Sequence, residues 1–194
     1  MKVYFANSLF NDADRMYNMY VVDTIRAKLN YDILIYNPME NDEINDKDEF
    51  ADAQMVANAD YEQLRDSDLL IAVLDSGDVG VGVEIGLAYE MGIPIIGVYT
   101  DVRQKGSDNK DKVKALSEIG QNQFSYVNIM QTGLIMNNGV MVDNTDDLIK
   151  RVIMFNEEYK RVNKWKSEAS RVLKRGRQTV RKMVEDGSAY YIYD

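Results

Sequence analysis

The stretch from residue 75 to residue 92 carries the strongest chemical signal in the sequence. Several glycines lie there between an apolar run and a helical pattern, and glycine lets a backbone approach a ligand closely. We expect the helix to begin near Val83, so that Glu84 lies beside free backbone N–H groups and is kept ionised by the helix dipole. An ionised carboxylate at this position can act as a nucleophile or a base. The alternative is an ordinary acid at a helix N-terminus.

The composition narrows the chemistry further. The 194 residues include no cysteine and no histidine, which excludes disulfides, a thiolate nucleophile and the commonest metal ligand. Acid–base catalysis must then use carboxylates, lysine or tyrosine. The glycine spacing does not match the dinucleotide-binding pattern Gly-x-Gly-x-x-Gly, and no Gly-Lys-Ser/Thr phosphate loop occurs. We therefore expect neither a metal nor a cofactor.

Four apolar runs alternate with helical patterns along the first hundred residues. We expect strands at residues 3–6, 32–36, 69–74 and 94–99, and helices that begin near residues 11, 50 and 83. This alternation predicts an α/β fold with a doubly wound, flavodoxin-like or Rossmann-like parallel sheet flanked by helices. Ligands bind such sheets beyond the carboxyl ends of the strands. The loops after Ala6, Tyr36, Leu74 and Tyr99 therefore form the predicted rim of the site.

The rest of the chain is less regular and turns basic. Residues 100–125 predict a loop, residues 126–142 are mixed with a turn at 138–139, and Asn144 or Thr145 caps a helix that continues past Tyr159. Residues 160–182 hold ten Lys or Arg and one acid, so they carry +9 and leave −18 for the rest of a chain whose net charge is −9. Apolar residues recur there at helical spacing. We interpret 1–145 as an α/β domain and 146–194 as a helical, basic C-terminal extension.

The charge distribution also bears on partners and location. The basic extension can pack on the acidic surface of its own chain or of a neighbouring subunit, and we favour this over nucleic acid or an acidic membrane. The overall negative charge disfavours nucleic acid as a partner of the whole surface. No apolar stretch approaches the roughly 20 residues that cross a bilayer, and no signal pattern opens the chain. We expect a cytoplasmic protein with no membrane partner.

Taken together, several segments resemble the nucleoside 2-deoxyribosyltransferase family over residues 3 to about 135. They match the order and approximate spacing of the family, and the segment that ends at Ala88 is the most specific of them. The matching segments are Val3-Tyr4-Phe5-Ala6-Asn7-Ser8-Leu9-Phe10, Asp60 on a helix, Asp78-x-Gly80-x-x-x-Glu84-Ile85-Gly86-x-Ala88, and Val127-Asn128-Ile129-Met130.

The resemblance implies roles for these residues. Glu84 falls where the family has the nucleophile that attacks C1' of deoxyribose, and Tyr4 falls where a tyrosine hydroxyl holds that carboxylate. Asp60 and Asp78 fall on acids that contact the leaving base and the sugar, and Gly80 lies beside them in the substrate-binding segment. Asn128 falls on an asparagine that reaches the 5'-hydroxyl in the neighbouring subunit. The family also implies a homo-oligomer with shared sites, usually a hexamer built from dimers.

The implied reaction moves 2-deoxyribose between a 2'-deoxynucleoside and a free nucleobase in nucleoside salvage. One carboxylate attacks C1' to give a covalent glycosyl-enzyme, a second acid protonates the departing base, and a new base then attacks the same face. Three alternatives remain open. They are a hydrolase that acts on deoxynucleosides or their 5'-monophosphates, a non-catalytic nucleotide-binding module, and a nucleic-acid-associated protein driven by the basic extension.

Overall fold

The structure of the chain is a computed structural model that describes all residues except 31, 46–47, 49, 103–109, 116–126 and 186–194. The chain separates into two units, Met1–Ile153 and Met154–Asp194. The first unit holds a five-stranded, wholly parallel sheet in the order β2-β1-β3-β4-β5. The strands are β1 (Lys2–Ala6), β2 (Leu34–Tyr36), β3 (Leu69–Val73), β4 (Ile95–Val98) and β5 (Gly139–Val142).

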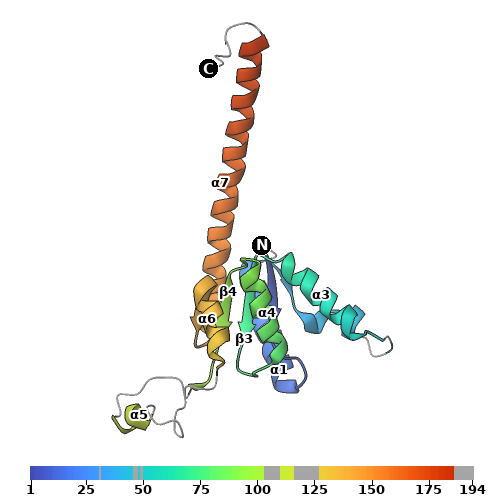
Figure 1. Cartoon of the computed structure of the whole chain (residues 1–194), viewed down its shortest axis with the longest axis vertical. Helices are drawn as coiled ribbons and strands as arrows, with labels where there is room; N and C mark the ends of the chain where they lie inside the picture. Colours follow the sequence, from blue (N-terminus) through green and yellow to red (C-terminus); the bar gives the residue numbers. More distant parts are fainter. Residues whose placement is uncertain (31, 46–47, 49, 103–109, 116–126, 186–194) are drawn as a thin grey trace. The chain divides into compact units, whose positions relative to one another are not determined.

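Helices connect these strands as the alternating pattern predicts, and α4 and α6 pack side by side (Figure 1). All five residues of β3 are buried, as its apolar sequence indicates for a central parallel strand. The helices are α1 (Asp12–Leu29), the 3-10 turn η1 (Pro38–Glu40), α2 (Asp42–Asn45), α3 (Ala53–Arg65), α4 (Val79–Glu90), α5 (Lys110–Ala115), α6 (Ile129–Asn138) and α7 (Thr145–Glu185). The predicted doubly wound α/β fold is thus confirmed.

The strand order decides which helices face the site. The chain moves from β1 to β2 in one direction along the sheet, and from β2 to β3, β4 and β5 in the other. Right-handed crossovers therefore place α1 on one face and α3, α4 and α6 on the opposite face. Leu64 of α3, Ile85 of α4 and Ile135 of α6 accordingly share one core with Tyr4 of β1.

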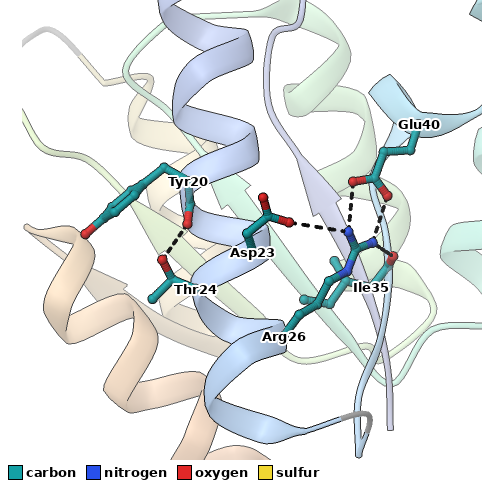
Figure 2. A network of polar contacts seen from close by, with 6 residues as sticks. All are labelled: Tyr20, Asp23, Thr24, Arg26, Ile35 and Glu40. Carbon is teal, nitrogen blue, oxygen red and sulfur yellow. Dashed lines mark hydrogen bonds and ion pairs between the residues drawn. The ribbon is translucent and has the colours of Figure 1, made fainter.

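One arginine ties the start of the second crossover to α1. In Figure 2, the Arg26 guanidinium donates to both carboxylate oxygens of Glu40, at 2.9 and 2.7 Å, and to the carbonyl oxygen of Ile35 at 3.0 Å. A planar guanidinium suits such a two-pronged contact. It fixes both ends of the segment that runs from the end of β2 through η1.

Three local expectations from the sequence differ from the structure. Helix α6 and a fifth strand, β5, occupy the segment interpreted as mixed, so the pair 138–139 joins a helix to a strand. A short helix, α5, lies within the predicted 100–125 loop, most of which falls outside the described residues. The helical spacing of residues 50–65 places Met55 and Leu64 among the residues that face inward, but Met55 is 51% exposed, and Leu64 is the residue of α3 that is buried.

The second unit consists, in its described part, of the C-terminal portion of α7. Asn144 caps this helix by accepting the N–H of Asp147 at 2.8 Å, as predicted. Trp165 and Val172, both 68% exposed, belong to its predicted apolar stripe. Of the helices described, none combines the length and apolarity needed to span a membrane. The proposed boundary between residues 145 and 146 stays a prediction.

Candidate active site

A buried tyrosine and a glutamate form the centre of the site. Tyr4 lies on β1 with its side chain toward α4, and its hydroxyl donates to Glu84 Oε1 at 2.5 Å. Tyr4 is fully buried, whereas Glu84 is partly exposed on α4. Burial beside Glu84 and Asp60 raises the pKa of Tyr4 far above its usual range, so the hydroxyl keeps its proton and acts as a donor.

Helix α4 begins four residues earlier than the sequence indicates, which changes the electrostatics of Glu84. Asp78 caps the helix, since its Oδ1 accepts the N–H groups of Gly80 at 2.6 Å and Val81 at 3.4 Å. Glu84 therefore lies in the second turn, beyond the turn where the helix dipole acts most strongly. Burial raises the pKa of Glu84 to about 7, the Tyr4 hydrogen bond lowers it, and the charges of Asp60 and Asp78 raise it. The expectation of a carboxylate held ionised by the helix start is thus wrong.

Asp60 faces the same site from α3. The Tyr36 hydroxyl, at the end of β2, donates to Asp60 Oδ1 at 3.3 Å and accepts from Asn41 Nδ2 at 3.0 Å. Burial raises the pKa of Asp60, and hydrogen bonds from Tyr36 and Tyr4 partly oppose that shift. The site therefore holds two carboxyl groups on two helices, and both bind protons more readily than they would in water.

Both carboxylates open onto one cleft between α3 and α4. Its volume is about 460 Å³. Such a volume lies within the range of small-molecule sites. Gly80 and Val83 contribute to its wall from the glycine-rich start of α4, and Tyr61 and Leu64 contribute from α3. The site thus offers an apolar wall with a few polar groups, formed by α3 and the N-terminal half of α4.

The sequence-predicted site residues divide into two groups. Tyr4, Asp60, Gly80 and Glu84 come together at the cleft. Asp78 and Asn128 cap helices instead. Asn128 Oδ1 accepts from Met130 N at 2.9 Å at the start of α6, and Asn128 does not line the cleft. A capping role leaves the other side-chain atoms of both residues available to a ligand. Their predicted substrate contacts stay predictions.

Sequence reasoning missed Tyr36 and Asn41. A signal was present, because Tyr36 ends a predicted strand and its loop belongs to the predicted rim. Nothing in the sequence, however, indicates that Tyr36 meets Asp60, which lies 24 positions later along the chain, or that Asn41 meets Tyr36. The contact arises only when β2 pairs with β1 and brings Tyr36 level with Tyr4.

Comparisons with known proteins support the sequence resemblance. A family model described as nucleoside 2-deoxyribosyltransferase matches residues 3–149. A conserved protein from Enterococcus faecalis V583 is 48% identical, with a TM-score of 0.72, over 79% of this chain and 97% of that chain. None of the curated proteins compared matches the chain.

Two further solved structures are more distant. A 2-deoxyribosyltransferase from Bacillus psychrosaccharolyticus shares 19% identity and a TM-score of 0.50, over 77% of this chain and 90% of that chain, and has the same fold. The CMP N-glycosidase BcmB from Clostridium botulinum shares 14% identity and a TM-score of 0.48, over 80% and 99% of the two chains. Because the family model spans most of the sequence, the chain belongs to the nucleoside 2-deoxyribosyltransferase family.

Proposed function

We propose that the protein transfers 2-deoxyribose between nucleobases through a covalent ester between C1' and Glu84. One observation carries the proposal: a buried tyrosine hydroxyl holds Glu84 at 2.5 Å, at the edge of a cleft that a second carboxyl group, Asp60, also lines. Two carboxyl groups in one cleft supply the nucleophile and the acid that glycosidic cleavage needs.

In the first half-reaction, ionised Glu84 attacks C1' of a 2'-deoxynucleoside. Tyr4 holds Oε1, which leaves Oε2 to form the new C–O bond while the C1'–N bond breaks. Asp60 gives its proton to a ring nitrogen of the departing base, so the base leaves as a neutral molecule. Burial raises the pKa of Asp60, which favours the protonated acid that this step needs. Burial also raises the pKa of Glu84, which opposes the ionised nucleophile, and the Tyr4 hydrogen bond offsets part of that effect.

In the second half-reaction, a new base enters the cleft and attacks C1' of the ester. Its ring nitrogen forms the C1'–N bond, Asp60 takes the proton that this nitrogen loses, and Glu84 leaves as a carboxylate. The Tyr4 hydrogen bond stabilises the departing carboxylate just as it orients the attacking one. Two displacements at C1' retain the original configuration.

The lining of the cleft favours unphosphorylated nucleosides over the 5'-monophosphates of the hydrolase alternative. Among the described residues that line it, none is Lys or Arg, and two are acids. A phosphate dianion near Asp60 and Glu84 would meet like charges. A 5'-phosphate needs hydroxyl groups, backbone amides or cations. Of the two serines in the predicted rim loops after β1 and β3, Ser8 is buried, and Ser76 Oγ already accepts the N–H of Asp78 at 3.3 Å. Arg103 and Lys105, the basic residues of the predicted rim loop after Tyr99, lie outside the described residues.

We also propose that the protein acts as a homo-oligomer, for which the family resemblance implies a hexamer built from dimers with shared sites. Val162, Trp165 and Val172 support this, because they are exposed at helical spacing on the unit Met154–Asp194. The basic segment 160–182 complements the −18 charge of the remaining chain, so a second copy is the favoured partner. The test is light scattering, which gives the molar mass in solution, at increasing salt concentration. A monomer at every salt concentration would contradict the proposal.

Base exchange is the decisive assay. Purified protein is incubated with 2'-deoxyinosine or thymidine and free adenine, and products are separated by chromatography. We expect 2'-deoxyadenosine to form, and Glu84→Ala to lower the rate by about 10³-fold or more with the fold intact by circular dichroism. Free base and deoxyribose without exchange would indicate a hydrolase, and the 5'-monophosphates would be tested next. No turnover would favour the binding module.

A further inference from the structure

Tyr36 is a residue of the site to which the reaction above gives no role, although it contacts both Tyr4 and Asp60. It is a strand tyrosine beside Tyr4, with the two ring centroids 5.2 Å apart and the two residues in register across β1 and β2. The two hydroxyl groups donate to different carboxyl groups, although Tyr4 also lies near enough to Asp60 to lower its pKa. Tyr4 donates its proton to Glu84, and Tyr36 donates to Asp60.

We propose that Tyr36 is a positioning residue that holds Asp60 Oδ1 as a hydrogen-bond acceptor, so that the proton given to the leaving base is carried on Asp60 Oδ2. The proposal rests on the proposed function, because it assigns an orientation to the acid of that reaction. A carboxylic acid whose Oδ1 accepts a hydrogen bond donates through its other oxygen. Asp60 therefore presents one defined proton to the cleft instead of two interchangeable oxygens.

Asn41 fixes the direction of the Tyr36 hydroxyl. Asn41 Nδ2 donates to Tyr36 Oη at 3.0 Å and so occupies a lone pair of that oxygen. The hydroxyl proton therefore points away from Asn41, toward Asp60 Oδ1 at 3.3 Å. Since a phenol has a single proton, the chain of donors runs one way, from Asn41 through Tyr36 to Asp60. Burial raises the pKa of Tyr36 to about 12, which keeps that proton in place throughout the working range of the carboxyl groups.

The backbone that carries Tyr36 and Asn41 is itself held. Arg26 binds the Ile35 carbonyl oxygen just before Tyr36 and the Glu40 carboxylate just before Asn41, as Figure 2 shows. The two ends of the loop are thus fixed on one guanidinium from α1. A catalytic acid needs its partners held to within a fraction of an ångström, and this clamp supplies that rigidity without touching the cleft.

The test compares donors that differ in their need for an acid. The base of 2'-deoxyinosine must be protonated to leave, whereas 7-methyl-2'-deoxyguanosine already carries a cationic base that leaves neutral. We expect Tyr36→Phe to lower kcat with 2'-deoxyinosine by about 10–100-fold and to change kcat with the methylated donor by less than about 3-fold. Thymidine and 5-fluoro-2'-deoxyuridine, whose base is the better leaving group, form the matching pair for a pyrimidine-specific enzyme.

A double-variant comparison identifies the route of the effect. Asp60→Asn should cause a larger loss with the same donor selectivity, and adding Tyr36→Phe to it should cause no further loss, because Tyr36 acts through Asp60. Tyr20→Phe is the matched control, since Tyr20 is an exposed tyrosine on α1 that does not line the cleft. Equal losses with both donors, or additive losses in the double variant, would overturn the proposal.

A titration separates this inference from the proposed function. The Asp60 carboxyl carbon is followed by NMR in ¹³C-labelled protein without substrate. Tyr36→Phe should raise the midpoint of Asp60, because the Tyr36 hydrogen bond lowers its pKa, and Tyr20→Phe should leave it unchanged. An unchanged midpoint in Tyr36→Phe overturns the inference even if the enzyme exchanges bases. A raised midpoint in a protein without base exchange leaves Tyr36 as a positioning residue and rejects only the transferase reaction.

Discussion

Replacing Tyr4 with phenylalanine removes the hydroxyl that holds Glu84 and keeps the ring in the core. The burial that raises the pKa of Glu84 to about 7 persists in this variant, while the hydrogen bond that lowers that pKa is lost. The pKa of Glu84 must therefore rise. A hydrogen bond to a charged group contributes about 1.5–3 kcal/mol. One pKa unit corresponds to about 1.36 kcal/mol, so the expected rise is about 1–2 units.

The consequence is a pH-dependent loss of activity. Glu84 attacks only when ionised, so the rate rises with pH through the pKa of this group. At pH 7 about half of Glu84 is ionised in the native protein. A pKa of about 8–9 in Tyr4→Phe would leave about 1–10% ionised, which predicts a loss of about 5–50-fold at pH 7 and a smaller loss at higher pH.

The assay is the pH dependence of kcat/KM for base exchange, which reports the free enzyme. Tyr20→Phe serves as the control, and thermal unfolding checks that Tyr4→Phe still folds. A midpoint on the acid side that stays near pH 7, or that moves down, would refute the reasoning. In that case the Tyr4 hydroxyl would not stabilise the ionised form of Glu84, and its role would be confined to packing.

Two further predictions follow from the same contacts. The folded-state pKa of Glu84 lies above its unfolded value of 4.5, so the native carboxyl retains its proton more strongly and stability falls as pH rises from about 4.5 to 7. Glu84→Gln should therefore raise the free energy of unfolding above pH 7 by at most about 3 kcal/mol, seen as a higher melting temperature, and change it little near pH 4. A variant less stable than the native protein at pH 8 would contradict this. Arg26→Lys should lower kcat with 2'-deoxyinosine several-fold but cost only about 0.2–1 kcal/mol of stability, because the Arg26–Glu40 pair is solvent-exposed; unchanged kcat would show that the loop needs no clamp.

The sequence predicts the sheet well where burial dominates. The run 69–74 is apolar throughout and forms β3, which is buried at every position. Strand β5 is not predicted because it is short, begins with a glycine and is only partly buried, so its three apolar residues do not stand out from the mixed segment around them. The structure nevertheless explains why position 139 is a glycine, since a Cβ there would collide with the backbone of Ile95 on β4. Such a constraint comes from the neighbouring strand and cannot be read from local pattern.

The start of α4 shows how tertiary context overrides local preference. Val79, Gly80, Val81 and Gly82 are poor helix formers, and a glycine costs about 1 kcal/mol in a helix interior. The sequence therefore favours a loop up to Val83. Asp78 reverses this preference by capping the free N–H groups. A helix that begins near Val83 would place Glu84 in the first turn and favour its ionised form, whereas burial in the second turn raises its pKa.

The register of two strands explains how a protein without histidine can place two carboxyl groups for opposite tasks. Tyr4 and Tyr36 lie opposite each other on β1 and β2, with both side chains in reach of the helices on one face. Because the two strands are paired in register, the backbone hydrogen bonds of the sheet fix the positions from which the two hydroxyl groups extend. Glu84 on α4 and Asp60 on α3 are each held by one of them, so the distance between nucleophile and acid is set by the spacing of two paired strands. Substitutions that destabilise α3 should therefore impair the protonation of the base by Asp60, while the attack by Glu84 on α4 stays intact.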